Sequence, residues 1–264
     1  MLSTREEIKS ALDAYHSYIA ANSRRALETL IPIIANWVPA EDDDTTEKEV
    51  PLLRLKSLNR LVDYRPVIRR LSDPTEVLTR WDELVPLLEL DGVRRFRLPG
   101  LDEEEDEDGV RHPLAVLADQ EYRELKFNEY IAVVEAALKD RVLEEARGTV
   151  AFPEELRILF ELGVDGLNGI GLQIWRGMFG CAFWDGLGQG NLEDVASRVQ
   201  VPDTKIEDEK QFAWRYTTGS EYGGQIFDTI PQLLDYYQGY EQYSMDYYVG
   251  DYANEEDLFP PGLL

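Results

Sequence analysis

The chain has 264 residues and a formal net charge of −25, with one cysteine and two histidines. The single cysteine, Cys181, excludes an internal disulfide, and Cys181, His16 and His112 do not have the spacing of a zinc site. No run approaches the roughly 18 apolar residues of a membrane-spanning helix, and the first residues form no apolar signal segment. The sequence therefore predicts a soluble, cytoplasmic protein with no metal ion and no cofactor.

The acidic charge is unevenly distributed along the chain. Residues 101–264 hold 12 basic and 35 acidic residues, a net of −23, whereas residues 51–100 hold 10 basic and 7 acidic residues, a net of +3. Such a field repels nucleic acid and anionic membranes and speeds encounter with a basic protein. We therefore expect a protein partner, possibly basic, although acidic surface can also serve solubility alone. The charge does not fix the oligomeric state.

The first hundred residues have helical periodicity. A capping box, Thr4-x-x-Glu7, opens the first helix, whose apolar face carries Ile8, Leu12, Tyr15 and Ile19. A second helical segment is expected over residues 23–37, where Pro32 must bend or start it. Further helices are expected over residues 52–61, 67–71 and 75–90. These elements predict a helical N-terminal region spanning residues 1–100.

Two acidic runs punctuate the chain. Residues 39–47 are expected to be a charged linker, since they hold too few apolar side chains to order themselves. Residues 102–108 are seven consecutive acids, whose mutual repulsion favours an extended, solvated loop. We therefore place an acidic linker at residues 101–118, between the helical region and the rest of the chain.

The pattern after this linker mixes helices and strands. A long helix is expected over residues 119–147, and strands near residues 171–175, 180–184 and 211–217, with another possible at 199–201. A short helix over residues 192–198 lies among them. The pattern favours the α+β class, with a mixed sheet covered by helices, in a domain of residues 119–250 followed by an extended tail, residues 251–264.

Residues 152–169 behave as one unit within this domain. Pro153 suits the first turn of a helix, where Glu154 and Glu155 meet the positive end of the helix dipole. The spacing of Leu156, Leu159 and Phe160 gives that helix one apolar face, which we expect to be buried. Asp165-Gly166 and Asn168-Gly169 are turn dipeptides, so Asp165, Asn168 and Gly169 are expected to shape the turn that follows.

This pattern resembles the SUKH superfamily, an α+β group that includes fungal cell-wall-assembly regulators and bacterial immunity proteins. The resemblance runs from about residue 121 to residue 242. Residues 130–138 look like the family's first helix, residues 153–169 like its proline-led helix with an Asn-Gly turn, and residues 226–237 like its closing helix with a Leu-Leu core. Residues 182–210 are longer, richer in glycine and more acidic than the family's strand meander, and the first hundred residues lie outside the match.

The resemblance implies a non-enzymatic, protein-binding scaffold, either a fungal regulator or an immunity protein that masks a toxin. The helical N-terminal extension and the Trp-Arg-Tyr strand at 214–216 look more like the fungal members. Aromatic and acidic side chains suit a protein interface, because a large ring gains contact area while the acids attract a basic partner. The candidate partner-binding residues are Trp175, Trp184, Asp185, Glu193, Asp194 and Tyr222.

Two other functions remain open. Asp185 or Asp194 near Trp184 could serve a hydrolase acting on a sugar or another small molecule, since glycosidases pair two carboxylates beside an aromatic wall. The chain holds 52 acidic residues, so such clusters also arise by composition. The other possibility is an oligomeric structural protein. Carboxylates buried in a closed pocket favour the hydrolase, and an open acidic face favours the binding protein.

Overall fold

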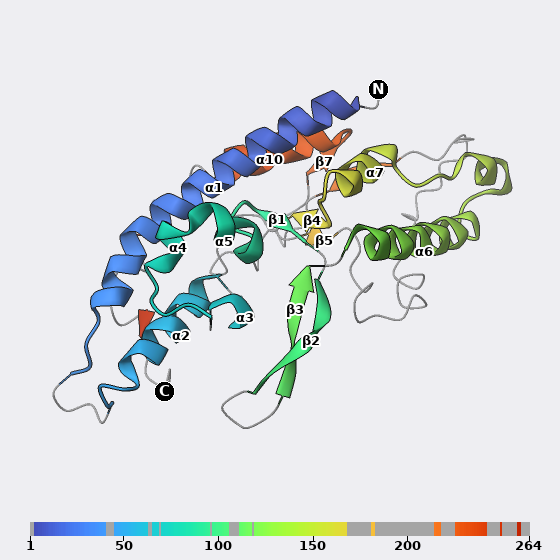
Figure 1. Ribbon diagram of the computed structural model, residues 1–264. Helices are drawn as coiled ribbons and strands as arrows, with labels where there is room; N and C mark the ends of the chain where they lie inside the picture. The colour runs from blue at the N-terminus through green and yellow to red at the C-terminus, as the bar shows by residue number, and fades with distance from the viewer. Residues whose placement is uncertain are drawn as a thin grey trace. The chain divides into compact units, whose positions relative to one another are not determined.

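A computed structural model describes residues 3–40, 45–62, 65–68, 70–95, 97–105, 111–117, 119–167, 181–182, 214–217, 225–241, 249 and 258–259. Helices dominate these residues, and apart from β2 and β3 the strands described are two residues long. The elements, drawn in Figure 1, are α1 (Arg5–Asn36), α2 (Val50–Val62), α3 (Arg65–Ile68), α4 (Glu76–Thr79), α5 (Trp81–Leu88), β1 (Val93–Arg94), β2 (Arg97–Glu105), β3 (Arg111–Leu117), α6 (Gln120–Lys139), the 3-10 helix η1 (Glu144–Thr149), α7 (Glu154–Glu161), β4 (Gly166–Leu167), β5 (Cys181–Ala182), β6 (Tyr216–Thr217), β7 (Ile226–Phe227) and α10 (Ile230–Glu241).

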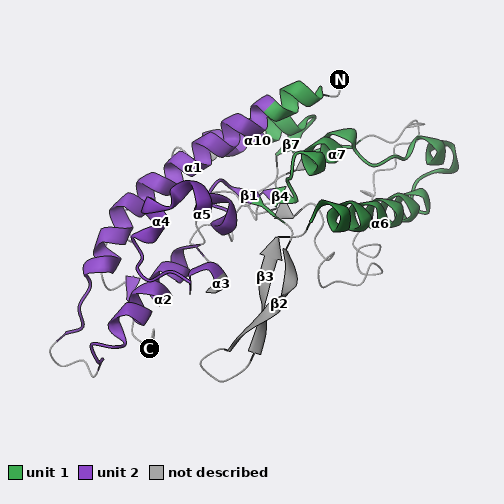
Figure 2. Ribbon diagram, in the orientation of Figure 1, with its two compact units in different colours: residues 1–9, 94–166, 182–233 green, residues 10–93, 167–181, 234–264 purple. Residues whose placement is uncertain are grey.

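The chain divides into two compact units, coloured separately in Figure 2. Unit 1 comprises residues 1–9, 94–166 and 182–233, and unit 2 comprises residues 10–93, 167–181 and 234–264. The strands form small sheets: β1, β4 and β5 pair in that order, β2 pairs with β3, and β6 pairs with β7. The last two pairs are antiparallel. The fold is thus mainly helical with small antiparallel sheets. The predicted helix at 192–198 and the predicted strands at 171–175 and 199–201 lie outside the described residues.

The capping box predicted at the start of α1 is confirmed. The backbone N–H of Thr4 donates to Glu7 Oε2 at 2.7 Å, and the Glu7 N–H donates to Thr4 Oγ1 at 3.3 Å. These bonds satisfy amides that the first helical turn leaves without an intrahelical acceptor. The predicted apolar face is buried, with exposures of at most 2% at Ile8, Leu12, Tyr15 and Ile19.

The expected second helical segment is not a separate helix. α1 continues through Pro32 to Asn36. Proline removes one backbone N–H donor from a helix but leaves its own carbonyl as an acceptor. The Asn36 side chain uses that carbonyl, donating from Nδ2 to Pro32 O at 2.8 Å. Buried residues on both sides of the proline, including Leu30 and Ile34, hold the helix in place despite the lost bond.

The charged linker expected at residues 39–47 contains part of a helix cap. Thr46 donates from its backbone N–H and its hydroxyl to Glu49 Oε2, at 2.7 and 2.6 Å, immediately before α2. Thr46-x-x-Glu49 is thus a second capping box, with the pattern of the one that opens α1. Residues 41–44 lie outside the described residues, so the linker prediction is corrected only for its end.

A large apolar core lies in unit 2. α1, α2 and α5 supply most of its fully buried side chains, and the segment between α3 and α5 supplies others. The single helix predicted over residues 75–90 is divided into α4 and α5 at Arg80, whose backbone (φ −108°, ψ 33°) leaves the helical region. The buried members of this core are Ala26, Leu27, Leu30, Ile31, Ile34, Leu58, Leu61, Val62, Ile68, Leu71, Val77, Leu84, Leu88, Leu90 and Leu258.

The acidic segment at residues 101–118 is a strand pair in its described part, not a solvated loop. β2 and β3 form an antiparallel hairpin whose register places Glu105 across from Arg111 and Leu98 across from Val116, with an irregularity between Pro99 and Glu103. Backbone hydrogen bonds stabilise a ladder whatever the charge of its side chains, which is why repulsion between acids did not decide the local structure. The domain boundary placed here stays a prediction.

α6 is shorter than predicted and covers a second apolar core, in unit 1. Asp119 caps it, accepting the Tyr122 N–H at 2.7 Å, and the helix ends at Lys139 where a helix to residue 147 was expected. η1 follows after a turn. The buried residues of this cluster are Phe127, Ile131, Val134, Leu138, Val150, Phe152 and Phe160.

α7 follows Pro153 as predicted and ends in a Schellman motif. The Gly163 N–H donates to Phe160 O and the Val164 N–H donates to Leu159 O, both at 3.0 Å. Gly163 has φ +87°, a left-handed conformation that glycine reaches without Cβ strain. The predicted burial is confirmed for Leu159 (0%) and Phe160 (4%), whereas Leu156 is only half-buried.

α10 contains the apolar Leu-Leu pair of the helix expected over residues 226–237, but it begins at Ile230. β7 precedes α10, and Leu233 and Leu234 are buried at 4% and 0% exposure. The strand expected at 211–217 is described at its end, where β6 pairs with β7. Trp214, just before β6, donates from Nε1 to Ala151 O at 2.6 Å and packs against the core of unit 1.

Candidate functional site

The candidate partner-binding residues Trp175, Trp184, Asp185, Glu193, Asp194 and Tyr222 lie outside the described residues, as do the turn residues Asn168 and Gly169. Asp165 is described. It is 4% exposed, and its carboxylate meets a charged side chain. Among the charged and polar contacts of the described residues, three arrangements join elements of the fold, two buried in unit 1 and one at the surface of unit 2.

The first arrangement is a buried ion pair between Arg123 of α6 and Asp165. Arg123 Nη2 lies 2.6 Å from Asp165 Oδ1, and Arg123 Nε lies 3.2 Å from Oδ2, so the guanidinium meets the carboxylate with two nitrogens. The two side chains are 9% and 4% exposed. Two-point contact and low exposure make such pairs strong and geometrically specific.

The remaining donors of Arg123 are also used. Nη1 donates to Gln120 Oε1 at 2.9 Å and Nη2 donates to Phe160 O at 3.2 Å, near the end of α7. The guanidinium carbon lies 4.4 Å from the centre of the Phe160 ring, which itself stacks on Phe127 at 4.0 Å. Arg123 therefore joins α6 to the end of α7 and to Asp165. The role of Asp165 is to hold this joint, in addition to its place in the turn.

The second arrangement is centred on Glu155, which is 0% exposed. Its Oε1 accepts the Ser3 N–H at 2.7 Å, and its Oε2 accepts the Ile230 N–H at 2.9 Å. The hydroxyl of Tyr216 is a third donor to this carboxylate. One side chain of α7 thus connects the residues ahead of α1, the first residue of α10 and strand β6.

Burial and the neighbouring Glu155 carboxylate raise the pKa of Tyr216 well above its usual value. The phenol therefore stays protonated and remains a hydrogen-bond donor at neutral pH. A proton-transferring group must gain and lose its proton near the working pH, and Tyr216 is held away from that condition. The geometry around Glu155 is that of a structural connection.

The sequence contained signals for both buried groups. Glu155 lies three and four residues before the buried Ile158 and Leu159, and Arg123 lies four residues before the buried Phe127. Residues at these spacings share a helix face, so each charge lies on an apolar face and requires a partner. The helix dipole alone explains an exposed acid such as Glu154 but not a buried one such as Glu155.

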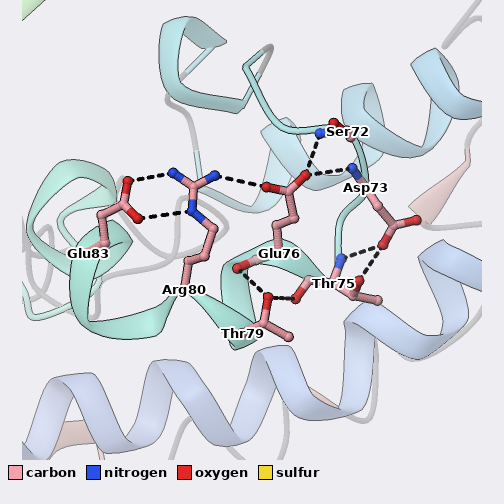
Figure 3. A network of polar contacts seen from close by, with 7 residues as sticks. All are labelled: Ser72, Asp73, Thr75, Glu76, Thr79, Arg80 and Glu83. Atoms are coloured by element: carbon pink, nitrogen blue, oxygen red, sulfur yellow. Dashed lines mark hydrogen bonds and ion pairs between the residues drawn. The ribbon is translucent and has the colours of Figure 1, made fainter.

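The third arrangement is a surface network in unit 2, shown in Figure 3. Arg80, at the break between α4 and α5, donates from Nη1 to Glu76 Oε2 at 2.8 Å and from Nε to Glu83 Oε2 at 3.0 Å. Glu76 also accepts the Ser72 N–H at 2.6 Å, and Asp73 accepts the Thr75 hydroxyl at 2.5 Å. The network holds the turn ahead of α4 and ties α4 to α5 across the break.

These contacts shift the pKa values of the network. The Ser72 N–H and the Arg80 side chain hold the pKa of Glu76 below its usual range, and the Arg80 side chain does the same for Glu83. The Thr75 hydroxyl and N–H lower the pKa of Asp73. Hydrogen bonds to Glu83 and Glu76 raise the pKa of Arg80. All four groups keep their charge at neutral pH, so the network has no group poised for proton transfer.

Metal-binding and membrane-spanning features were sought in the described part of the chain. There, no group of three or more His, Cys, Asp or Glu side chains could hold a metal ion. None of the helices described is both long and apolar enough to cross a bilayer.

Comparison with known proteins gave no relative: no family model, no curated protein and no solved structure matches the chain. Function must therefore be inferred from the residues themselves.

Proposed function

We propose that the chain is a non-enzymatic, cytoplasmic scaffold that binds a basic partner protein through an acidic surface carrying apolar and aromatic side chains. The observation that carries the proposal is the surface of residues 119–167. Eight acidic residues are exposed there against three basic ones. The exposed acids are Asp119, Glu121, Glu124, Asp140, Glu144, Glu145, Glu154 and Glu161, and the exposed bases are Lys139, Arg141 and Arg147.

Large apolar side chains are exposed among these acids. Leu125 on α6 is 54% exposed and Leu143, just before η1, is 58% exposed. Protein interfaces combine an apolar contact with charges that set encounter rate and specificity, and this surface offers both. The expected partner-binding residues Trp175, Trp184 and Asp185 belong to the same acidic C-terminal half of the sequence.

The buried carboxylates support a binding protein over an enzyme. Glu155 accepts backbone N–H groups and Asp165 meets Arg123, while the partly buried Glu135 accepts the Phe152 N–H at 2.8 Å. A carboxylate whose oxygens are occupied by structural donors has little capacity left for a substrate. These carboxylates connect elements of the fold through hydrogen bonds and an ion pair.

The proposal includes a SUKH-like α+β domain, which the order of elements supports. α6, α7 and α10 occupy the parts of the sequence that the resemblance assigns to the first helix, the proline-led helix and the closing helix. The partner is then a protein, with the fungal regulators as the nearer analogy because of the helical N-terminal region.

The test compares two charge-reversed full-length chains of equal net charge. One carries Glu121→Lys, Glu144→Lys and Glu145→Lys on the acidic surface, and the control carries Asp13→Lys, Glu47→Lys and Asp82→Lys at exposed positions of unit 2. A partner is first captured on the unaltered chain from the source cell and purified. Its association rate is then measured by stopped flow at salt concentrations from about 0.01 to about 0.15 M, over which the Debye length falls from roughly 30 to 8 Å.

We expect association with the unaltered chain to slow by about 10-fold or more across this range, since electrostatic steering is screened by salt. Reversal of the acidic surface should slow it at low salt more than the control reversal does. A rate that ignores salt, or that responds equally to both variants, contradicts the proposal. Turnover of a small-molecule substrate that is lost on Asp185→Asn supports the hydrolase instead.

A further inference from the structure

Leu258 and Phe259 dock on the helical core of unit 2. Leu258 is 2% exposed and belongs to the same cluster as Leu58 of α2 and Ile34 of α1. The Phe259 ring stacks on the ring of Trp37, which follows α1, with the centroids 4.2 Å apart and the planes 8° from parallel. Leu258 and Phe259 lie 17 and 18 residues beyond the end of α10, and they make an apolar and an aromatic contact with unit 2.

The same place binds the backbone of the docked segment. Ser57 of α2 is 1% exposed, and its hydroxyl donates to the Leu258 carbonyl oxygen at 2.9 Å. The aromatic platform is fixed as well, because Arg54 donates from Nε and Nη2 to the Trp37 carbonyl oxygen at 3.2 and 2.7 Å. Peptide-binding sites combine hydrogen bonds to the main chain with apolar and aromatic contacts to side chains. The Ser57 hydroxyl, the apolar core and the Trp37 ring supply these three contacts here.

The charges of the two segments are complementary. α2 carries Arg54, Lys56 and Arg60 and no acidic residue, in a chain whose net charge is −25. Three acids, residues 255–257, directly precede Leu258. A basic helix beside the binding place of a segment led by three acids favours an acidic peptide over a neutral or basic one.

We propose that α2 and the end of α1 form a binding site for an acidic peptide ending in Leu-Phe, in which the chain's own Leu258 and Phe259 lie. The occupant belongs to the same chain, so it competes intramolecularly with any free peptide. A partner protein with acids followed by Leu-Phe gains access when this segment is displaced. The site lies in unit 2 and is independent of the acidic surface proposed above.

The test uses the full chain with the double substitution Leu258→Ala and Phe259→Ala, which empties the site but leaves its walls. A fluorescein-labelled peptide with the sequence of residues 251–262 is titrated against it and followed by fluorescence anisotropy. We expect saturable binding, at least about 10-fold tighter than to the unaltered chain, where the tethered segment competes. A control peptide with alanine at both the Leu and Phe positions should bind at least about 10-fold more weakly.

Charge is tested on the receptor. Lys56→Glu with Arg60→Glu, added to the emptied chain, should weaken peptide binding at low salt and have less effect at about 0.5 M salt. Absence of binding to an emptied chain that keeps its helical circular dichroism overturns the proposal. Equal affinity for the two peptides also overturns it, since charge alone would then explain the binding.

A second variant covers the case in which the double substitution unfolds unit 2. Phe259→Ala keeps the buried Leu258 and removes only the stacking on Trp37. Amide hydrogen exchange in α2 should then be faster than in the unaltered chain, and about 1 mM of the unlabelled peptide should restore the protection. Exchange that is unchanged by Phe259→Ala, or not restored by the peptide, contradicts the proposal.

Discussion

Carboxylates in the two units make the same kinds of hydrogen bond in opposite surroundings. Asp165 and Glu155 of unit 1 are 4% and 0% exposed, and they meet Arg123, backbone N–H groups and a phenol. Glu76 and Glu83 of unit 2 meet Arg80 at the surface, where the Arg80 side chain is 40% exposed. Water replaces a lost partner at the surface but cannot do so inside, so the cost of breaking similar contacts should differ greatly.

The largest effect is expected for Arg123→Met. It leaves the Asp165 carboxylate buried without its cation, and breaking a buried ion pair in this way costs about 3 to 5 kcal/mol. Urea denaturation followed by circular dichroism gives the change in unfolding free energy. Replacing both partners, with Arg123→Met and Asp165→Asn, should recover part of the loss. A double variant as unstable as the sum of the single variants contradicts coupling between the two charges.

Glu155→Ala is expected to cost about 3 to 4 kcal/mol, since three donors lose a common acceptor and each buried unsatisfied group costs at least about 1 kcal/mol. Hydrogen exchange should rise at Ser3 and Ile230 together, because one carboxylate serves both. The matched control is Tyr216→Phe, which removes one donor and keeps both backbone bonds, at about 0.5 to 1.5 kcal/mol. Equal losses for the two variants argue against Glu155 as the common acceptor.

Replacing a glycine by alanine should change the free energy of unfolding by a smaller amount. The sign of the change should be opposite at Gly163 and Gly239. Gly163→Ala places a Cβ at φ +87° and should cost about 1 to 2 kcal/mol, although no atom lies within 4 Å of that Cβ. Gly239→Ala, inside α10 with equally open surroundings, should stabilise by about 0.5 to 1 kcal/mol. Thermal unfolding midpoints should therefore move in opposite directions. Movement in the same direction refutes the conformational explanation.

The smallest effect is expected in the surface network. Glu76→Gln at neutral pH should leave the unfolding midpoint nearly unchanged, because the contacts are solvent-exposed. The pKa of Glu76 is lowered below its ordinary 4.5, so the small effect of the substitution on stability should depend on pH. Its stabilisation is complete above pH 4.5 and is lost as the pH falls through the folded-state pKa. The difference between the two chains should therefore shrink from pH 6 to pH 3, and a difference that grows contradicts the assignment.

Local rules predicted much of the fold. The capping box at Thr4, the buried face of α1 and the start of α7 after Pro153 follow from side chains within a few residues of one another, so the sequence alone sufficed. The errors arose where a longer-range contact decided the structure. α1 continues through Pro32 because buried neighbours hold it, and the acids of residues 102–105 form a strand because β3 pairs with them.

The candidate site was less predictable. The partners of Glu155 lie 152 and 75 residues away along the chain, a separation that no local pattern reports. Periodicity could have shown that Glu155 and Arg123 face a core, but not which groups they meet there. Leu258 and Phe259 had no distinguishing pattern beyond the three acids before them. The predicted interface at Trp175, Trp184 and Asp185 lies outside the described residues and stays a prediction.

The β2–β3 hairpin has a consequence for how copies of the chain behave together. It is a two-stranded ribbon, so within the described residues each strand has one edge with no neighbour. Open strand edges invite pairing with another molecule, which leads to aggregation. Here Pro99 and Pro113 withhold two N–H donors, and the four acids of residues 102–105 in β2 favour repulsion between two ribbons. Low pH or concentrated salt weakens that repulsion. Under either condition we expect the chain to aggregate before its helices unfold.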